Sequence, residues 1–468
     1  MKLAPQFIQS PIRNIYGSLP DKIKYGKLFN ETYDFLQQSQ WWSKKKHEEY
    51  QIKELKRLIN HAYENVPYYF KVFNERGIKP KDIQNFNDFK MLPYLTKEII
   101  QNNLKDLVAR NYNKKELLQA TTGGTTGVPM GFYENKKTSK VVEYAFMTSQ
   151  WARLGYNISK RNKCVILRGN LVENGYYLQK GDDLVLSSFK MSENNMEQYV
   201  ELIEKFNPDF IQAYPSSISI LSNYILSSNK NVNIKSLKAV LCGSENLYDF
   251  QRTKIEKAFH ARTYSWYGHS EKSCLAGECN ESSFYHIFSE YGYCEIINSQ
   301  GVEASKENEI GELVCTGFNN YVMPFIRYKT CDIVSNTVSS CKCGRNYKLI
   351  KKIRGREQEV FVAKSGTLIT FTCSDDPLWS IKDKILAYQY IQNEPGEVAL
   401  CIEAKKEFLD SDMQIVKSEF FKYYPTLNIK IQIIDKIKRN SNGKFKYLIQ
   451  NLPVGFGDYF KLEELVNE

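Results

Sequence analysis

Hydrophobic positions recur at helical spacing through the first part of the chain. In one stretch the apolar residues would share a single helix face: Ile52, Leu55, Leu58, Ile59, Ala62 and Tyr63. Charged residues occupy the opposite face. This pattern predicts a mostly helical segment over the first 110 residues.

From about Leu117 the pattern changes, and short apolar runs alternate with helical stretches. The runs that predict buried strands are Cys164–Leu167, Phe210–Tyr214 and Ala239–Cys242, and Met196–Phe206 predicts a helix. Buried strands that alternate with helices are typical of a largely parallel sheet. We therefore expect an α/β domain in this region.

Two further patterns follow along the chain. After Tyr285, short strand-like segments predict a β-rich subdomain: Tyr293–Ile297, Gly311–Thr316 and Asp332–Val334. After Arg356, strand-like and helix-like runs alternate and predict a small α+β domain: Val398–Ile402, Met413–Tyr424 and Ile429–Ile434. We predict a large N-terminal domain over 1–357 and a small C-terminal domain over 358–468.

Composition limits the class of protein. The chain has 468 residues, of which 42% are hydrophobic, and a prior of about 150 residues per domain predicts roughly three structural units. Disorder, collagen and a small disulfide scaffold are excluded. The charges, 64 Lys and Arg against 53 Asp and Glu, give +11, a mild bias toward anionic ligands such as nucleotides that does not by itself indicate nucleic acid.

The sequence also predicts where the protein works. It has no run of about 18 apolar residues, it begins without the hydrophobic region of a signal peptide, and its mean hydropathy is −0.48. We expect a cytoplasmic protein with no membrane span. Its 11 cysteines are scattered along the chain, which favours reduced thiols or a metal site over a disulfide framework.

The strongest local motif is a threonine- and glycine-rich run. It consists of Thr121, Thr122, Gly123, Gly124, Thr125, Thr126 and Gly127, followed by Val128 and Pro129. Glycines let backbone N–H groups turn toward an anion, and threonine hydroxyls add donors for phosphate oxygens. The run predicts a phosphate loop, with a surface turn as the alternative. Because Val128 follows Gly127, the Walker A pattern is absent and a P-loop NTPase is disfavoured.

Three shorter motifs carry groups that suit a nucleotide. In Tyr267–Glu271, a ring that can stack on a base precedes a carboxylate that can hold Mg²⁺. Gly243–Glu245 follows a predicted strand, and Asp332 could accept hydrogen bonds from ribose hydroxyls. Taken singly, each is more often a buried tyrosine or a surface acid, but their order along the chain is informative.

The order of the motifs resembles that of adenylate-forming enzymes. The phosphate loop is followed by Gly243–Glu245, Tyr267–Glu271, Pro324–Asp332, Gly355–Arg356 and Asn442–Lys444. The chain is similar to the phenylacetate–CoA ligase family, and within it to the branch named for capsular polysaccharide biosynthesis proteins. Leu58–Tyr69 and Asn207–Ser217 also resemble that branch. The resemblance implies an α/β adenylate-forming-enzyme fold with a large, multi-subdomain N-terminal domain and a small, mobile C-terminal domain.

The resemblance implies a role for each motif residue. The ATP phosphates would lie on the loop from Thr121 to Gly127, with Thr122 and Thr126 catalytic. The adenine would be framed by Gly243, Ser244, Glu245, Tyr267 and Gly268, and the ribose would be held by Asp332 and Arg356. Glu271 would bind Mg²⁺, and Lys444 would reach in from the C-terminal domain during adenylation. Val128 stands where many relatives carry Lys, and Gln358 with Glu359 replaces the usual pair of Asp at the hinge.

The reaction that the resemblance implies is the AMP-forming activation of a small carboxylic acid by ATP. The acyl group would then pass to a thiol, either CoA or a carrier protein. Transfer to an amine in capsule or surface polysaccharide biosynthesis is a close alternative.

A second constellation has the chemistry of a zinc site. Cys279, His286, Cys341 and Cys343 offer three sulfurs and one nitrogen, which suit a closed, tetrahedral, structural Zn²⁺ site, whereas unliganded thiols are the alternative. Possible substitutes are Cys274, Cys294 and Cys331. A zinc-containing nucleotide- or nucleic-acid-binding protein without catalysis is a hypothesis from a different class, although the basic residues are spread along the chain.

The pair Trp41 and Trp42 precedes three lysines. We expect half-buried packing of both tryptophans rather than a membrane- or partner-facing patch.

Overall fold

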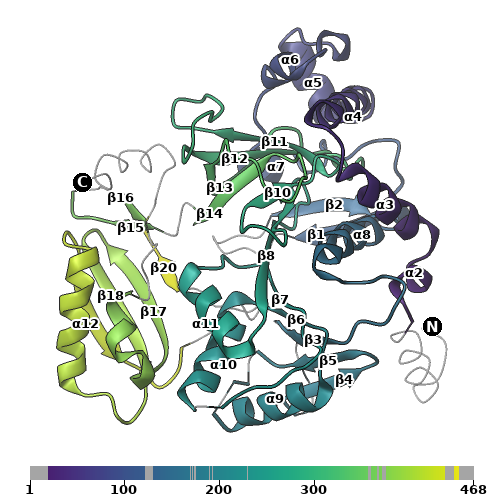
Figure 1. Ribbon diagram of the computed structural model, residues 1–468. Helices are drawn as coiled ribbons and strands as arrows, with labels where there is room; N and C mark the ends of the chain where they lie inside the picture. Colours follow the sequence, from purple (N-terminus) through teal and green to yellow (C-terminus); the bar gives the residue numbers. More distant parts are fainter. Residues whose placement is uncertain are drawn as a thin grey trace. The chain divides into compact units, whose positions relative to one another are not determined.

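The fold is known from a computed structural model of the chain (Figure 1). It describes residues 19–121, 130–168, 170, 172, 175–188, 190–191, 193–228, 230–356, 360–365, 368–370, 376–437 and 447–452. The chain divides into two compact units, the first formed by Met1–Asn162 with Tyr264–Ile353 and the second by Lys163–Thr263 with Arg354–Glu468. The predicted domains 1–357 and 358–468 stay a prediction.

The N-terminal part of unit 1 is helical, as predicted. Its helices are α2 (Asp21–Lys24), α3 (Gly26–Ser39), α4 (Lys44–Asn65), α5 (Pro67–Glu75), α6 (Phe86–Lys90) and α7 (Lys97–Asn102). Helix α4 begins where the Ser43 side chain accepts a hydrogen bond from the Lys46 amide, and α5 begins on Pro67, which has no N–H to lose. Most of the predicted apolar face of α4 is fully buried: Leu55, Leu58, Ile59 and Ala62.

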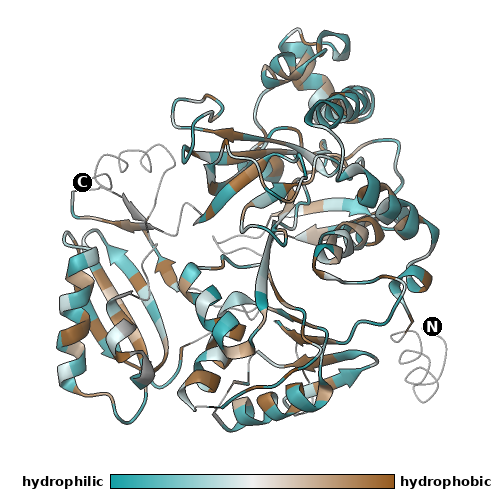
Figure 2. Cartoon of the chain, viewed as in Figure 1, coloured by the Kyte–Doolittle hydropathy of each residue, from teal (hydrophilic) through white to brown (hydrophobic). Residues whose placement is uncertain are grey.

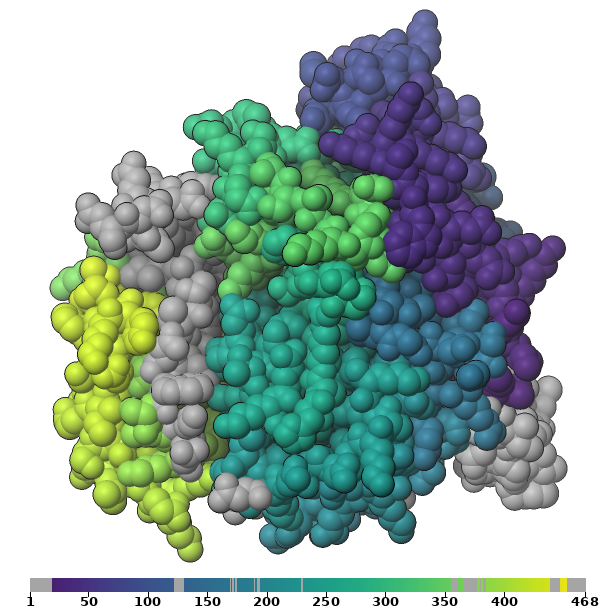
Figure 3. All heavy atoms as spheres, in the orientation of Figure 1, coloured from purple at the N-terminus to yellow at the C-terminus, as the bar shows by residue number. Residues whose placement is uncertain are grey.

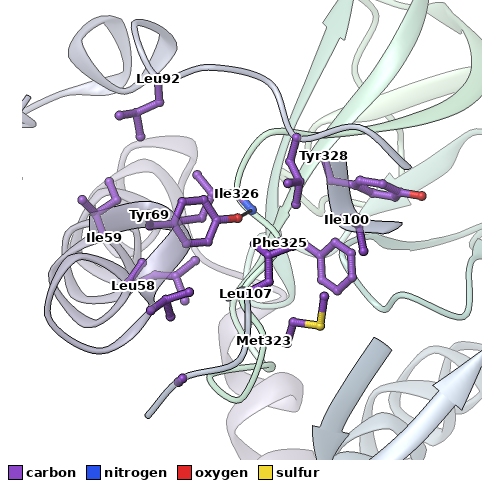
Figure 4. Packing of buried hydrophobic residues seen from close by; sticks show 14 of the residues in the cluster. Leu58, Ile59, Tyr69, Leu92, Ile100, Leu107, Met323, Phe325, Ile326 and Tyr328 are labelled. Carbon is purple, nitrogen blue, oxygen red and sulfur yellow. Dashed lines mark hydrogen bonds between the residues drawn. The ribbon is translucent and has the colours of Figure 1, made fainter. Parts of the chain in front are cut away.

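These helices pack against a segment far away in sequence. Leu58, Ile59 and Tyr69 share one hydrophobic cluster with residues 322–328 (Figure 4). The Tyr69 hydroxyl donates to the Pro324 carbonyl at 2.9 Å and accepts from the Ile326 amide at 3.2 Å. The space-filling view shows purple atoms of the N-terminal part against green atoms from much later in the chain (Figure 3).

The rest of unit 1 is built from antiparallel strands. A two-stranded ribbon, β1 (Leu117–Thr121) with β2 (Gly131–Asn135), precedes helix α8 (Ser139–Trp151). A larger sheet has the order β11-β12-β13-β14-β10-β9-β8. Its strands are β8 (Arg262–Gly268), β9 (Leu275–Gly277), β10 (Tyr285–Ile287), β11 (Gly292–Ile297), β12 (Ile310–Gly317), β13 (Tyr328–Asn336) and β14 (Leu349–Arg356). The predicted β-rich region is confirmed.

Two glycines let the segment that carries Lys272 and Ser273 pass close over this sheet. Gly292 and Gly317 face each other across β11 and β12. A Cβ atom on Gly292 would lie 2.7 Å from the Ser273 carbonyl oxygen, and one on Gly317 would lie 2.8 Å from the Lys272 carbonyl oxygen. Backbone atoms cannot give way easily, so this crossing requires glycine at both positions.

Unit 2 begins with the predicted parallel sheet. The strands β3 (Cys164–Leu167), β5 (Asp183–Leu186), β6 (Phe210–Ala213) and β7 (Ala239–Cys242) run parallel in the order β7-β6-β3-β5, with β4 (Tyr177–Lys180) antiparallel at the edge. The helices are α9 (Glu193–Phe206), α10 (Pro215–Ser227) and α11 (Asp249–Phe259). Hydrophobic and hydrophilic positions alternate along α9, as its sequence pattern requires (Figure 2).

The later part of unit 2 has the predicted α+β pattern. A four-stranded sheet has the order β19-β18-β17-β20 and is joined by helix α12 (Asp410–Tyr423). The strands are β17 (Ile385–Glu394), β18 (Glu397–Ala404), β19 (Asn428–Ile433) and β20 (Leu448–Gln450), and β15 (Val360–Val362) pairs with β16 (Leu368–Thr370). Throughout the described ranges, no helix is long and apolar enough to span a membrane.

A buried ion pair anchors the helices of unit 1 to its sheet. Arg327 donates to both carboxylate oxygens of Glu295, at 3.0 and 2.9 Å, and the two side chains are 5% and 1% exposed. Arg327 also donates to the carbonyls of Lys90, the last residue of α6, and of Leu92, just after it. Its φ of +50° places it in the left-handed region, which costs strain that these contacts offset.

We expect Glu295→Gln to destabilise the protein strongly. It leaves the buried guanidinium without its counter-ion, a change that costs about 3–5 kcal/mol when a buried pair is broken. The check is urea denaturation of the full chain. Glu197→Gln, which removes the exposed partner of Lys230, is the control and should change the free energy of unfolding by at most about 1 kcal/mol. Equal effects of the two variants would contradict the anchoring role of Arg327.

Candidate active site

The Glu271 carboxylate is held in a fixed orientation in the loop after β8. One of its oxygens accepts a hydrogen bond from the Tyr328 hydroxyl at 2.9 Å, and the other lies 3.1 Å from Nδ1 of His269. The other ring nitrogen of His269 lies 3.1 Å from the Ser273 hydroxyl. The carboxylate is therefore positioned by Tyr328 and by His269, and Ser273 in turn holds the His269 ring in place.

The surroundings of Glu271 keep it ionised. Burial is the largest single influence on its pKa and raises it, but the charge of His269 and the hydrogen bonds from His269 and Tyr328 outweigh burial and lower the pKa to about 2. Burial and the nearby charge of Glu271 raise the pKa of Tyr328, so its hydroxyl stays a donor. An ionised carboxylate oxygen is the type of ligand that Mg²⁺ prefers.

Two other residues that are predicted to contact the nucleotide, Tyr267 and Asp332, lie side by side. Tyr267, near the end of β8, donates its hydroxyl hydrogen to Asp332 on β13 at 2.5 Å. The Tyr267 ring lies 6.0 Å from the His269 ring, and the His269 ring lies 6.2 Å from the Tyr328 ring. The structure therefore brings Tyr267, Glu271 and Asp332 into one cluster. Gly268 lies at the same strand end, where a Cβ atom would come within 3.1 Å of Leu275 Cδ1.

Lys272 fixes the Glu271 loop to the strand that follows the predicted phosphate loop. Its ammonium group lies 2.9 Å from the Glu134 carboxylate on β2 and 2.7 Å from the Ser139 hydroxyl. Glu134 is 4% exposed. The φ of +53° at Lys272 turns the chain back toward β2. No sequence motif marks this contact, because the two residues lie 138 positions apart.

Several predicted residues fall outside the described part of the chain. These are Thr122, Gly123, Gly124, Thr125, Thr126 and Gly127 with Val128, the hinge residues Gln358 and Glu359, and Lys444. Of the predicted phosphate loop, only Thr121 is described, as the exposed last residue of β1. Strand β14 ends at Arg356. Their predicted roles stay predictions.

Gly243–Glu245 lies in unit 2, at the carboxyl end of the parallel strand β7. The Ser244 hydroxyl accepts a hydrogen bond from Arg168, which follows β3, at 3.1 Å. The Glu245 carboxylate accepts from the amide and the hydroxyl of Ser216, at 3.0 and 3.1 Å, at the start of α10. Glu245 therefore caps a helix, and its part in framing adenine stays a prediction. Sequence reasoning missed Arg168, although carboxyl ends of parallel strands are where ligands bind.

The predicted zinc ligands meet in one cluster on unit 1. Cys279 follows β9, His286 lies on β10, and Cys341 and Cys343 precede β14, and their four ligand atoms lie within 4.8 Å of one another. The Cys279 and Cys341 sulfurs are 3.5 Å apart, and the Cys343 sulfur is 3.2 Å from Nε2 of His286. Nδ1 of His286 lies 3.0 Å from the Phe284 carbonyl, which can only accept. Nε2 is therefore the nitrogen available to a metal.

These distances fit a tetrahedral ion. Zinc bonds of about 2.3 Å to sulfur and about 2.0–2.1 Å to nitrogen place sulfurs about 3.8 Å apart and sulfur and nitrogen about 3.5 Å apart. The observed separations are only slightly shorter. The donor set and these two separations are therefore consistent with a Zn²⁺ site.

The loop that carries Cys341 and Cys343 is attached to the N-terminal helices. Arg345 donates to the Gln40 side chain at 2.8 Å and lies over the Trp41 ring at 4.5 Å. Trp42 is half-buried, as predicted, with the Lys46 ammonium 4.5 Å from its ring centre. Trp41 is 55% exposed, so its predicted half-burial is wrong.

The fold defines a class of protein. The crystal structure of 2-hydroxyisobutyryl-CoA ligase in the postadenylation state matches with a TM-score of 0.70 at 15% identity, over 88% of this chain and 91% of that chain. The fold is that of the adenylate-forming enzymes, as predicted.

Sequence comparison finds similar proteins that match most of the chain. A model of the CapK C-terminal domain matches residues 361–451. Protein CapK of Staphylococcus aureus is 24% identical over 96% of this chain and 98% of its own length. Phenylacetate–coenzyme A ligase of Thermus thermophilus is 24% identical over 86% of this chain and 92% of its own. Over most of its length the chain is thus similar to the family of adenylate-forming enzymes that includes CapK and the phenylacetate–CoA ligases.

The low pKa of Glu271 predicts a loss of stability in acid. Because the folded pKa is lowered to about 2 from 4.5, the carboxylate stabilises the folded state above about pH 4.5, and this contribution disappears as the pH falls toward 2. The free energy of unfolding of Glu271→Gln should therefore fall less steeply over this interval, by roughly one proton. Urea unfolding at a series of pH values is the measurement. Glu49→Gln, at an exposed position, should keep the parental slope, and parallel curves for parent and Glu271→Gln would refute the assignment.

Proposed function

We propose that this protein uses ATP to activate a small carboxylic acid as an acyl-adenylate, releasing pyrophosphate, and then transfers the acyl group to a thiol. The observation that carries the proposal is the buried, ionised carboxylate of Glu271 beside the Tyr267–Asp332 pair, in a chain similar to this family. The names of its relatives, phenylacetate–coenzyme A ligase and 2-hydroxyisobutyryl-CoA ligase, favour CoA as the thiol.

The chemical difficulty of the first step is repulsion between two anions. A substrate carboxylate attacks the α-phosphate of ATP, and negative charge accumulates as the pentacoordinate state forms. Donors of the loop from Thr121 to Gly127, including Thr122 and Thr126, and the charge of Lys444 would stabilise that state. Glu271 would hold Mg²⁺, which supplies positive charge beside the phosphates. Tyr328 and His269 would keep the Glu271 oxygens aimed in one direction, so that little reorganisation is needed.

The remaining nucleotide contacts would come from the other residues of the sequence motifs. Asp332 would accept from the ribose hydroxyls, and Tyr267, positioned by its hydrogen bond to Asp332, would present its ring to the adenine. Gly243, Ser244 and Gly268 would contribute backbone and small side chains around the base. The acyl-adenylate is a mixed anhydride that water destroys, so closure by the C-terminal domain would protect it before the thiol arrives.

An amine acceptor is the second candidate. The similarity to Protein CapK extends over nearly the whole of both chains, and the C-terminal match is to the CapK domain rather than to a ligase named for CoA. Such an enzyme would work in capsule or surface polysaccharide biosynthesis. Product analysis with CoA and with amino sugars in parallel separates the two acceptors, because only one of them would consume the adenylate faster than water does.

The metal of the four-ligand cluster would be structural. Cys279, His286, Cys341 and Cys343 would complete a tetrahedral Zn²⁺ shell and leave no position for substrate. Zn²⁺ there would join β9 and β10 to the loop that Gln40 and Trp41 hold through Arg345.

Pyrophosphate exchange into ATP, screened over a panel of carboxylic acids, tests the proposed activity. We expect exchange that depends on one class of acid, and we expect Glu271→Gln to require more Mg²⁺ and to turn over about 10²–10³-fold more slowly, as for the loss of one preorganised charged group. Glu49→Gln is the control and should match the parent. If none of the acids supports exchange, the proposed function is wrong. An unchanged Mg²⁺ titration in Glu271→Gln would overturn the role of Glu271.

Metal analysis tests the zinc proposal. Protein purified without chelators should contain close to one equivalent of zinc, and Cys343→Ser should lose it and melt at a lower temperature, because the binding energy of a structural metal appears as folding energy. Cys401→Ser changes a buried cysteine whose sulfur lies 3.8 Å from the Gln432 side-chain oxygen, outside the cluster, and should keep the zinc. Zinc-free protein, or a Cys343→Ser variant as stable as the parent, would refute the site.

A further inference from the structure

A second group of sulfurs lies on the same sheet and belongs to neither site described above. Cys274, Cys294 and Cys315 are 1%, 2% and 0% exposed. Their three sulfurs lie within 4.8 Å of one another. Three thiols from three separate segments thus face a single point in the core of unit 1.

The backbone explains how the three sulfurs converge. Cys294 and Cys315 are direct partners across β11 and β12, so their side chains emerge on one face of the sheet. Gly292 and Gly317 are the partner pair two residues along, and side chains two residues apart in a strand share a face. The segment that passes over these glycines therefore places Cys274, the residue after Ser273, on the face that carries the two other sulfurs.

The set of donors selects a particular class of ion. Three sulfurs with no hard ligand suit a soft cation with a filled d shell, because thiolates prefer such ions to Mg²⁺ or Ca²⁺. Within the described ranges, no further His, Cys, Asp or Glu joins the three sulfurs, so the fourth ligand of a closed zinc site is missing. A three-coordinate ion such as Cu(I) needs no fourth ligand.

The electrostatic surroundings favour a thiolate at Cys294, whereas burial raises the pKa of the Cys274 and Cys315 thiols, whose protons a bound cation must displace. Hydrogen bonds from Cys274 and Cys315 are the largest influences and hold the pKa of Cys294 well below its usual range, although burial opposes them. The charges of Lys348 and His269 act in the same direction as these hydrogen bonds. The ammonium group of Lys348 also donates to the Cys294 carbonyl at 3.0 Å, so a cation stands beside the cluster.

We propose that Cys274, Cys294 and Cys315 form a trigonal thiolate site for a soft cation of the Cu(I) type, separate from the zinc cluster. Binding replaces thiol protons, which pass to solvent, by three metal–sulfur bonds. Because the sulfurs are buried, the ion enters as the chain folds, as in other structural metal sites. The bound ion ties the segment that carries Glu271 to strands β11 and β12.

Cadmium is a suitable probe because it is soft, has a filled d shell and gives sulfur-to-metal charge-transfer absorption. The full chain is produced in cells grown with Cd²⁺, purified without chelators, and examined by elemental analysis and by cadmium NMR. We expect two equivalents of cadmium and two resonances, one for three sulfurs and one for three sulfurs with a nitrogen. Refolding of the cadmium-loaded chain in the presence of Cu(I) should replace cadmium at the first of these.

Variants assign each equivalent to its site. Cys294→Ser and Cys274→Ala should each lose one cadmium and the all-sulfur resonance, whereas Cys343→Ser should lose the other, and Cys401→Ser should keep both. Parental protein with a single equivalent that Cys343→Ser removes would overturn the proposal, whether or not the core variants fold. A second cadmium that persists in both Cys294→Ser and Cys274→Ala would overturn it equally.

Discussion

The buried pair of Arg327 and Glu295 is the interaction on which the rest of unit 1 depends. A guanidinium this deeply buried is tolerated only when paired, and here it donates hydrogen bonds to two carboxylate oxygens and two backbone carbonyls. One residue thereby links the end of α6, strand β11 and the start of β13. The next residue, Tyr328, orients Glu271. The ion pair thus determines where the hydroxyl that positions the candidate Mg²⁺ ligand stands.

The four residues from Glu271 to Cys274 show how closely structure and chemistry are joined here. Glu271 carries the ionised carboxylate, and Lys272 ties the loop to β2. Ser273 contacts His269 and passes over Gly292, and Cys274 completes the group of three sulfurs. Each side chain has a separate partner, so the loop has little freedom. A ligand that must act without reorganisation benefits from such a loop, because its cost of ordering has been met in folding.

The sequence predicted most strands and helices because the hydrophobic period is a local property. The runs at Cys164–Leu167 and Ala239–Cys242 are buried strands whatever their partners. The zinc cluster was also accessible, because an S₃N donor set is rare enough to be recognised by residue type alone. The contact of Lys272 with Glu134 was not, since it joins positions 138 apart and follows from a left-handed turn that no motif signals.

Register is the other quantity that sequence reasoning lacked. Cys294 and Cys315 are neighbours only because β11 and β12 pair in one alignment, and a shift of one residue would send one of them to the opposite face. The exposed position of Trp41 likewise could not be predicted, because it depends on Arg345, which lies over the ring while more than half of the residue stays exposed. Both facts depend on tertiary contacts that composition does not encode.

The charges around Tyr328 bear on what the candidate site needs. Its pKa is raised first by burial and then by the charges of Glu271 and Asp332, so two carboxylates lie near one hydroxyl. Glu143, which accepts from Tyr291 at 2.6 Å, has its pKa raised, chiefly by burial and also by the charge of Glu134. Lys272 is paired with Glu134 and His269 with Glu271. The negative charge of Glu271 is thus stabilised by His269 and Tyr328, and it is available to attract a divalent cation. In the proposed reaction such a carboxylate would favour a metal–nucleotide complex over the nucleotide alone, because the cation would offset negative charge that ATP and Glu271 both carry.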